Sequence, residues 1–278
     1  MAADDTALAV RWLHVGGKLS GGGERPARRA GRPAVARHRS RAGPADGAHD
    51  PGVLDAFAEH FRLIAPDTRG SGRTRHADGT PSFDVLADDV LGLIDALELD
   101  RPRLCGFSEG GTTATIVGIR EPAAVGAIVN DAGYDLFNPE SPSFPMMRQM
   151  FGGTPDATEA DPEGMQRAFD GNQDMRATFQ LMRADQDGAQ GAGHWKQYLR
   201  LAFARLSRGA GYRFGDLRAI AAPTLILAGD RDHFCTVEDG ALAFRALERG
   251  ELAILPGTGH VITEAKVRAS IEFLRRVA

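Results

Sequence analysis

A serine between two glycines is the part of this sequence best suited to covalent chemistry. Residues 106–110 read Gly-Phe-Ser-Glu-Gly, between an apolar run at 103–107 and a segment of helical character at 109–120. A serine on so sharp a strand-to-helix turn adopts strained backbone angles, and the glycines let neighbouring backbone pass close by. The pattern predicts that Ser108 is a nucleophile exposed above a sheet. The backbone N–H of Glu109, at the start of the helix, would then face a developing oxyanion.

A serine hydroxyl needs a base to accept its proton, and His260 is the histidine in the most suitable context. It follows an apolar run at 251–255 through the loop Pro-Gly-Thr-Gly at 256–259. That loop is expected at the same carboxyl edge of a sheet as Ser108. The alternative is a loop histidine that only caps the last helix. The other histidines have no matching context: His14, His38, His49, His60, His76, His194 and His233.

Asp230 and Asp232 are the two carboxylates placed to orient that histidine. Both follow an apolar run at 224–228, within Gly-Asp-Arg-Asp at 229–232. A carboxylate bonded to the imidazole fixes its tautomer and stabilises the imidazolium. The chain order serine, aspartate, histidine is one that parallel α/β sheets support. The residues alone leave the choice between the two aspartates open.

The elements that must position these residues alternate, from residue 52 onward, between short apolar runs and longer segments of helical period. This alternation is typical of an α/β fold in which a mostly parallel central sheet is flanked by helices. The expected strands are 61–65, 103–107, 127–129, 224–228 and 251–255, and the expected helices are one capped by Ser82, then 109–120, 237–247 and 266–277.

Between residues 134 and 216 the strand signal disappears, and helix-like segments such as 195–206 take its place. We therefore expect an inserted helical cap or lid over 134–216, and an α/β core formed by 1–133 and 217–278. Six of the seven methionines lie in the insertion. Methionine suits adaptable apolar surfaces, which favours a lid over an apolar substrate pocket. The alternative is that these side chains pack a small core of the insertion's own.

These motifs, with the loop Asp-Thr-Arg-Gly-Ser-Gly-Arg-Thr at 67–74, resemble the α/β-hydrolase superfamily over roughly residues 52–133 and 217–278. The resemblance implies an eight-stranded, mostly parallel sheet with a helical cap inserted before the strand that carries the acid. It also implies that the acid is the aspartate three residues after the glycine of Gly-x-x-Asp, which is Asp232 here. Asp230 remains the alternative.

One segment departs from the family pattern. Residues 21–51 hold seven arginines, and Val35 is their only aliphatic residue larger than alanine. Such a stretch is atypical of a buried strand and reads as a disordered segment, a surface loop or a shifted reading frame of GC-rich DNA. The family's early strand and His-Gly motif, which supply the second oxyanion donor, are expected within 21–50 and are missing there. His14-Val15-Gly16-Gly17 and Gly21-Gly22-Gly23 are possible substitutes, and the second donor stays unknown.

Composition limits the partners. The net charge is −4 and the sequence pI is about 6.1, which gives no basic footprint for nucleic acid or for an anionic membrane surface. No run approaches the roughly 18 apolar residues of a membrane helix, and no secretory signal is evident, so we expect a cytoplasmic protein. Cys105 and Cys235 are expected to be structural thiols. No metal and no organic cofactor is implied, and the expected partner is a small molecule with an apolar part.

The expected activity is hydrolysis of a small carboxylic ester, lactone or related acyl compound by a Ser108, His260 and Asp232 triad through an acyl-enzyme. A cofactor-free perhydrolase or a carbon–carbon bond hydrolase would use the same three residues. The competing class is a non-catalytic ligand-binding relative, or a damaged copy that lacks a complete oxyanion hole. The sequence does not separate these, nor does it give the natural substrate or the oligomeric state.

Overall fold

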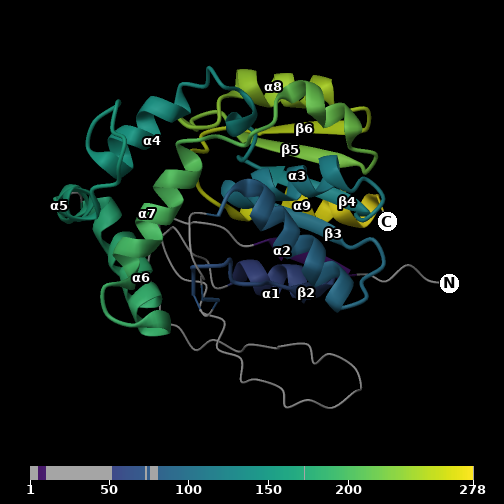
Figure 1. The fold of residues 1–278 in the computed structure, drawn as a ribbon. Helices are drawn as coiled ribbons and strands as arrows, with labels where there is room; N and C mark the ends of the chain where they lie inside the picture. Colours follow the sequence, from purple (N-terminus) through teal and green to yellow (C-terminus); the bar gives the residue numbers. More distant parts are fainter. Residues whose placement is uncertain (1–5, 11–51, 73, 76–80, 172, 278) are drawn as a thin grey trace, which may run out of the picture.

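A six-stranded parallel sheet forms the centre of the molecule, with strand order β2-β1-β3-β4-β5-β6 (Figure 1). The computed structural model describes residues 6–10, 52–72, 74–75, 81–171 and 173–277. The strands are β1 (Thr6–Val10), β2 (Arg62–Ile64), β3 (Arg103–Phe107), β4 (Ala127–Asp131), β5 (Thr224–Gly229) and β6 (Gly250–Leu255). The mostly parallel sheet expected from the sequence is confirmed, with six strands in the described residues where the family resemblance implied eight.

Strand β1 corrects one expectation. It lies between β2 and β3, with Ala9 opposite Cys105, so the strand beside the one that leads to Ser108 comes from residues 6–10 and not from 21–50. Its sequence, Thr-Ala-Leu-Ala-Val, has too few large aliphatic residues to be recognised as a central strand by local preference. It is a strand because it pairs in parallel with β2 on one edge and with β3 on the other.

Strand β4 is longer than expected, because it continues beyond Val129 through Asn130 and Asp131. These polar residues look like the start of a loop, but both side chains are buried and have partners: the Asn130 amide donates to Thr115 Oγ1 (2.8 Å) and Lys266 donates to Asp131 (2.6 Å). Once these groups are satisfied, the ladder can continue. In contrast, β2 is shorter than the expected 61–65.

Helices cover both faces of the sheet. Helices α2 (Phe83–Ala96), α3 (Glu109–Arg120) and α8 (Val237–Ala246) pack on one face, and α1 (Gly52–Ala58) and α9 (Glu264–Arg276) pack on the other. Strand β4 shows why two layers form: Ile128 belongs to the first core, whereas Ala127 and Val129 belong to the second. Ser82 caps α2 as expected and accepts from the amide of Val85.

Between β4 and β5 the described chain is helical and gathers to one side of the sheet (Figure 1). Buried methionines there pack with aromatic rings, and the Phe179 and Trp195 rings meet edge-on at 5.7 Å. The elements are η1 (Asp135–Phe137), α4 (Ser143–Gly152), α5 (Pro162–Asp170), α6 (Gln173–Gln190), α7 (His194–Leu206) and η2 (Phe214–Ala219).

These helices contact the core at the loop that follows β2. Gln190 donates to the carbonyl of Gly72 (2.9 Å), Gln186 accepts from the Gly72 amide (3.3 Å), and the ring of His194 lies 3.1 Å from the Gly70 carbonyl oxygen. None of the helices in the described ranges has the length and apolar character needed to cross a membrane.

Candidate active site

Ser108 occupies a strained turn between β3 and α3. Its backbone has φ 54° and ψ −124°, in the left-handed region that L residues rarely adopt. The turn is held by a hydrogen bond from the Ser108 amide to the carbonyl of Asp131 (2.8 Å). Gly106 is required beneath it, because a Cβ there would lie 2.2 Å from the carbonyl carbon of Gly110. The side-chain hydroxyl is thereby directed to the carboxyl edge of the sheet.

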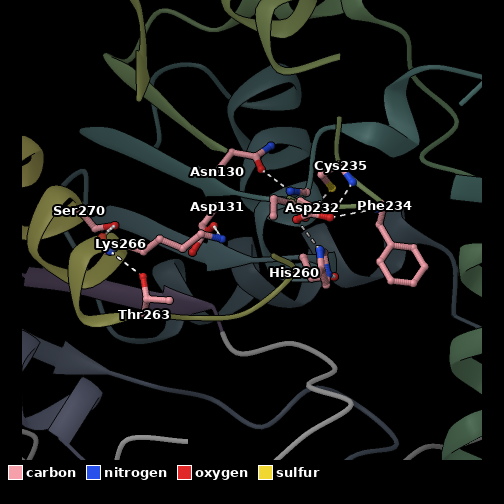
Figure 2. A network of polar contacts seen from close by, with 12 residues as sticks. Asn130, Asp131, Asp232, Phe234, Cys235, His260, Thr263, Lys266 and Ser270 are labelled. Atoms are coloured by element: carbon pink, nitrogen blue, oxygen red, sulfur yellow. Dashed lines mark hydrogen bonds and ion pairs between the residues drawn. The ribbon is translucent and has the colours of Figure 1, made fainter. Parts of the chain in front are cut away.

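His260 stands between Ser108 and Asp232. Its Nε2 lies 3.1 Å from Ser108 Oγ. Its Nδ1 lies 2.8 Å from Asp232 Oδ2 (Figure 2). The imidazole contacts two aromatic rings, with centroid distances of 4.9 Å to Phe107 and 5.2 Å to Phe234. The structure therefore brings together the three side chains singled out from the sequence, with both ring nitrogens of His260 engaged.

Asp232 is the aspartate that reaches the histidine. Its Oδ1 accepts from the amides of Phe234 and Cys235, each at 2.9 Å, while its Oδ2 faces His260 (Figure 2). Burial acts to raise the pKa of Asp232, but the hydrogen bonds and charge of His260 and the two amides outweigh it, so the pKa lies below its usual value of 3.8. Asp230 points elsewhere and accepts from the Thr258 amide at 3.3 Å.

The loops after β5 and β6 are joined, which fixes Asp232 relative to His260. The amide of Arg231 donates to the carbonyl of Thr258 (2.9 Å), and the amide of Asp230 donates to the carbonyl of Leu255 (3.1 Å). Because β3, β5 and β6 run parallel, their carboxyl ends share one edge, and the three side chains meet there.

A buried ion pair at the end of β4, close to the three side chains, was not expected from the sequence. Lys266, on α9, donates to Asp131 at 2.6 Å, and both side chains are almost fully buried (Figure 2). Burial raises the pKa of Asp131 in spite of the adjacent ammonium. The polar pair Asn130-Asp131 directly after an apolar strand was the available signal, because polar residues at a strand's carboxyl end often belong to a site.

Cys235 connects the Asp232 loop to the segment after β4. Its sulfur lies 3.0 Å from the carbonyl oxygen of Ala132 and 3.1 Å from Asp135 Oδ1, either of which can accept the one thiol proton. Its carbonyl accepts from the Tyr134 hydroxyl (3.1 Å). Burial raises the pKa of the Cys235 thiol well above its ordinary value, and burial raises the pKa of Asp135. These contacts were also missed, because they join residues 100 to 103 positions apart.

Within the described residues, Asp232, Cys235 and His260 are the one group whose ligand atoms lie close enough to consider a metal, within 4.8 Å of one another. These atoms already have partners: Asp232 accepts three hydrogen bonds, and the Cys235 sulfur lies within hydrogen-bond distance of two oxygens. Metal binding would need a thiolate, which the raised thiol pKa opposes. The donor set fits a hydrogen-bonded network better than a metal centre.

Glu109 follows the serine as the first residue of α3, so its amide has no carbonyl partner one turn earlier in the helix. Its side chain has a contact that the sequence did not suggest, an ion pair of 2.6 Å with Arg205 on α7. The candidate segments for a second oxyanion donor, His14-Val15-Gly16-Gly17 and Gly21-Gly22-Gly23, lie outside the described residues, as do the arginine-rich residues 21–51.

Comparison with known proteins agrees with this fold. A family model described as alpha/beta hydrolase fold matches residues 42–266, and the chain belongs to that family. It is 26% identical to 3-oxoadipate enol-lactonase 1 of Acinetobacter baylyi, over 72% of each chain. It is 29% identical to the pimeloyl-[acyl-carrier protein] methyl ester esterase of Nitrosospira multiformis, over 74% of this chain and 80% of the relative.

Among solved structures, a meta-cleavage product hydrolase from Pseudomonas fluorescens matches with a TM-score of 0.65 and 18% identity, over 99% of this chain and 93% of that one. At that identity the match shows the fold alone. The relatives in sequence are hydrolases, which supports hydrolase activity for this chain.

Proposed function

We propose that this protein is a serine hydrolase that cleaves small carboxylic esters or lactones through an acyl-enzyme. The observation that carries the proposal is the continuous chain of short contacts from Ser108 Oγ to His260 (3.1 Å) and from His260 to Asp232 (2.8 Å). A nucleophile, a base and an orienting acid in hydrogen-bond reach of one another form the arrangement that activates a serine.

In the proposed reaction, Ser108 Oγ attacks the carbonyl carbon, and its proton passes to Nε2 of His260. Asp232, ionised and buried, stabilises the imidazolium through Nδ1. The carbonyl electron pair moves to oxygen, where the Glu109 N–H stabilises the charge. The C–O bond of the leaving group then breaks, and His260 returns the proton to the departing oxygen. Water repeats these steps on the acyl-enzyme and frees Ser108.

The substrate class rests on the relatives and on the inserted helices. One relative acts on an enol-lactone and another on a methyl ester, by their names, and both reactions open an acyl–oxygen bond. We propose that residues 134–216 form a cap that covers the apolar part of such a substrate. The support is the position of these helices between β4 and β5, because the buried methionines and aromatic rings pack against one another, as in the alternative of an internal core.

The test is labelling of the purified protein with a fluorophosphonate probe, followed by hydrolysis assays on short-chain p-nitrophenyl esters and lactones. Ser108→Ala should abolish both labelling and turnover. Ser207→Ala, which changes the serine directly after α7, should leave both intact. Peptide mapping should place the adduct on Ser108. A folded wild-type protein that neither labels nor hydrolyses any member of the panel would refute the proposal and favour a non-catalytic ligand-binding protein.

A further inference from the structure

Two helix ends, one from the core and one from the inserted helices, meet at a buried ion pair beside the candidate nucleophile. Glu109 is the first residue of α3, and Arg205 is the second-last residue of α7. Arg205 Nε lies 2.6 Å from Glu109 Oε1, and the two side chains are 5% and 1% exposed. One member of this ion pair, Glu109, directly follows Ser108 in the chain.

Each charge suits the helix that carries it. A carboxylate at a helix N-terminus and a guanidinium at a helix C-terminus both interact favourably with the helix dipoles. The guanidinium of Arg205 also lies over the Phe83 ring, 5.9 Å from its centroid. Glu109 Oε2 is buried and has no hydrogen-bond partner within the described residues, so Arg205 supplies the compensation for that carboxylate. Removal of either partner would leave a buried charge without compensation.

The ion pair adds a side-chain contact from α7 to a turn whose other contacts come from the core. Ser108 is fixed by its own amide, which donates to Asp131, and by its carbonyl, which accepts from the Thr112 amide (3.1 Å). Thr112 is fixed in turn by a hydrogen bond from its hydroxyl to the Gly133 carbonyl (2.8 Å). Glu109 lies between these anchored residues. The Ser108 carbonyl and the Glu109 N–H belong to one planar peptide group, so the Thr112 hydrogen bond orients that N–H, and Arg205 holds the Glu109 side chain of the same turn.

We propose that Arg205 is a positioning residue: by pairing with Glu109 it holds the first turn of α3 in place, so that the position of the Glu109 N–H relative to the oxyanion depends on the docking of α7. The inference rests on the proposed serine hydrolase function. It assigns to the inserted helices a part in stabilising the transition state, in addition to covering substrate. Arg205 is separated from the reacting atoms by Glu109, so its effect should appear in turnover more than in substrate binding.

The experiment compares wild type, Arg205→Met, Arg205→Lys and the double variant Glu109→Gln/Arg205→Met. The readouts are kcat and KM for p-nitrophenyl acetate, and the inhibition constant of a methyl trifluoromethyl ketone. Addition of Ser108 Oγ to that ketone moves the proton to His260 and the carbonyl electron pair to oxygen, so its affinity reports oxyanion stabilisation. Lys196→Met is the matched control, because Lys196 also lies on α7 but pairs with Glu163 on α5 and not with the turn that carries Ser108.

We expect Arg205→Met to lower kcat and ketone affinity by about tenfold to a hundredfold, with KM changed by no more than about twofold. The double variant should recover only in part, because it removes the uncompensated carboxylate but also the ion pair that holds the turn. The kcat and ketone affinity of Arg205→Lys should lie between those of wild type and Arg205→Met. This variant keeps the test decisive if Arg205→Met does not fold. Lys196→Met should match wild type.

Unchanged kcat and ketone affinity in folded Arg205→Met and Arg205→Lys, beside an active wild type, would overturn the inference alone. Full recovery of kcat and ketone affinity in the double variant would also overturn it, because the turn would then keep its position without the ion pair. Wild-type protein with no labelling and no hydrolysis would instead remove the proposed function, and this inference with it.

Discussion

The carbonyl oxygen of Thr258 lies so close to Gly229 that a Cβ on that glycine would stand 2.1 Å from it. Gly229 ends β5 three residues before Asp232, and Thr258 precedes His260 by two. The close approach allows the loop that carries the histidine to cross over the end of the strand that carries the acid. It therefore sets the 2.8 Å contact between His260 and Asp232.

Replacement of Gly229 by alanine should disrupt this crossing. A Cβ at 2.1 Å from backbone oxygen requires one loop to move, and a shift of about 1 Å in a catalytic group can cost on the order of a hundredfold in rate. We expect kcat/KM on the best ester to fall by that order. Gly92→Ala is the control: it lies in α2 with open space around it, and alanine there should raise stability by about 1 kcal/mol. Full activity in Gly229→Ala would contradict the role given to the crossing.

Much of the candidate site could be predicted from the sequence because its signals are local. Ser108 lies within a five-residue pattern, and Asp232 and His260 each follow an apolar strand through a short glycine-containing turn. The structure places all three within hydrogen-bond distance. The choice of Asp232 over Asp230 came from the family resemblance, and the geometry agrees, because Asp230 faces the Thr258 amide.

The missed features depend on contacts between distant parts of the chain. Strand β1 has two alanines in five residues and is a strand because β2 and β3 pair with it. Glu109 and Arg205 are 96 positions apart, and Asp131 and Lys266 are 135 apart. No local pattern distinguishes a charged residue that will be buried against a partner from one on a solvated helix face. Only the packing of α7 and α9 makes that distinction.

The two aspartates of the Gly-Asp-Arg-Asp turn should respond differently to neutralisation. Asp232→Asn keeps the shape but loses the charge that supports the imidazolium, and the expected loss in kcat is about 10⁴-fold. Asp230→Asn retains an oxygen that can accept from Thr258, so it should keep kcat within about twofold of wild type. Steady-state kinetics on one ester check both. Equal losses in the two variants would mean that the turn, and not the Asp232 carboxylate, is what matters.

Both cysteines should be unreactive in the folded protein. Burial raises the pKa of Cys105 to about 12, and burial raises the pKa of Cys235 well above its ordinary value, so neither forms the reactive thiolate at mildly alkaline pH. We expect no reaction with Ellman's reagent at about pH 8 in buffer, and reaction of both thiols in denaturant. Ala189→Cys, at an exposed position of α6, should react at once and serves as the positive control. Rapid labelling of Cys235 in native protein would show that the loop carrying Asp232 and Cys235 opens to solvent.

Asp135 should make the stability of the protein depend on pH. Its side chain is buried, and burial raises its pKa above the ordinary value of 3.8 in spite of contacts from Ser143 and Cys235. A group with a raised folded pKa stabilises the fold fully below its unfolded pKa, and that contribution is lost as the pH rises through the folded pKa. Ionisation of Asp135 at neutral pH therefore costs stability that the unfolded chain does not pay.

Asp135→Asn removes that cost, because an amide does not ionise and its oxygen can still accept from the Cys235 thiol. The gain in unfolding free energy of Asp135→Asn over wild type should be small near pH 4 and should grow toward pH 7. It should grow by about 1.4 kcal/mol for each unit by which the folded pKa is raised. Urea unfolding across that range measures it. The control is Asp156→Asn, whose carboxylate is exposed in the folded protein, so the difference should stay flat. A difference for Asp135→Asn that is also flat, or that falls with pH, would show that Asp135 shares a compensating charge in the folded state, since only a stabilised carboxylate could escape the cost of burial.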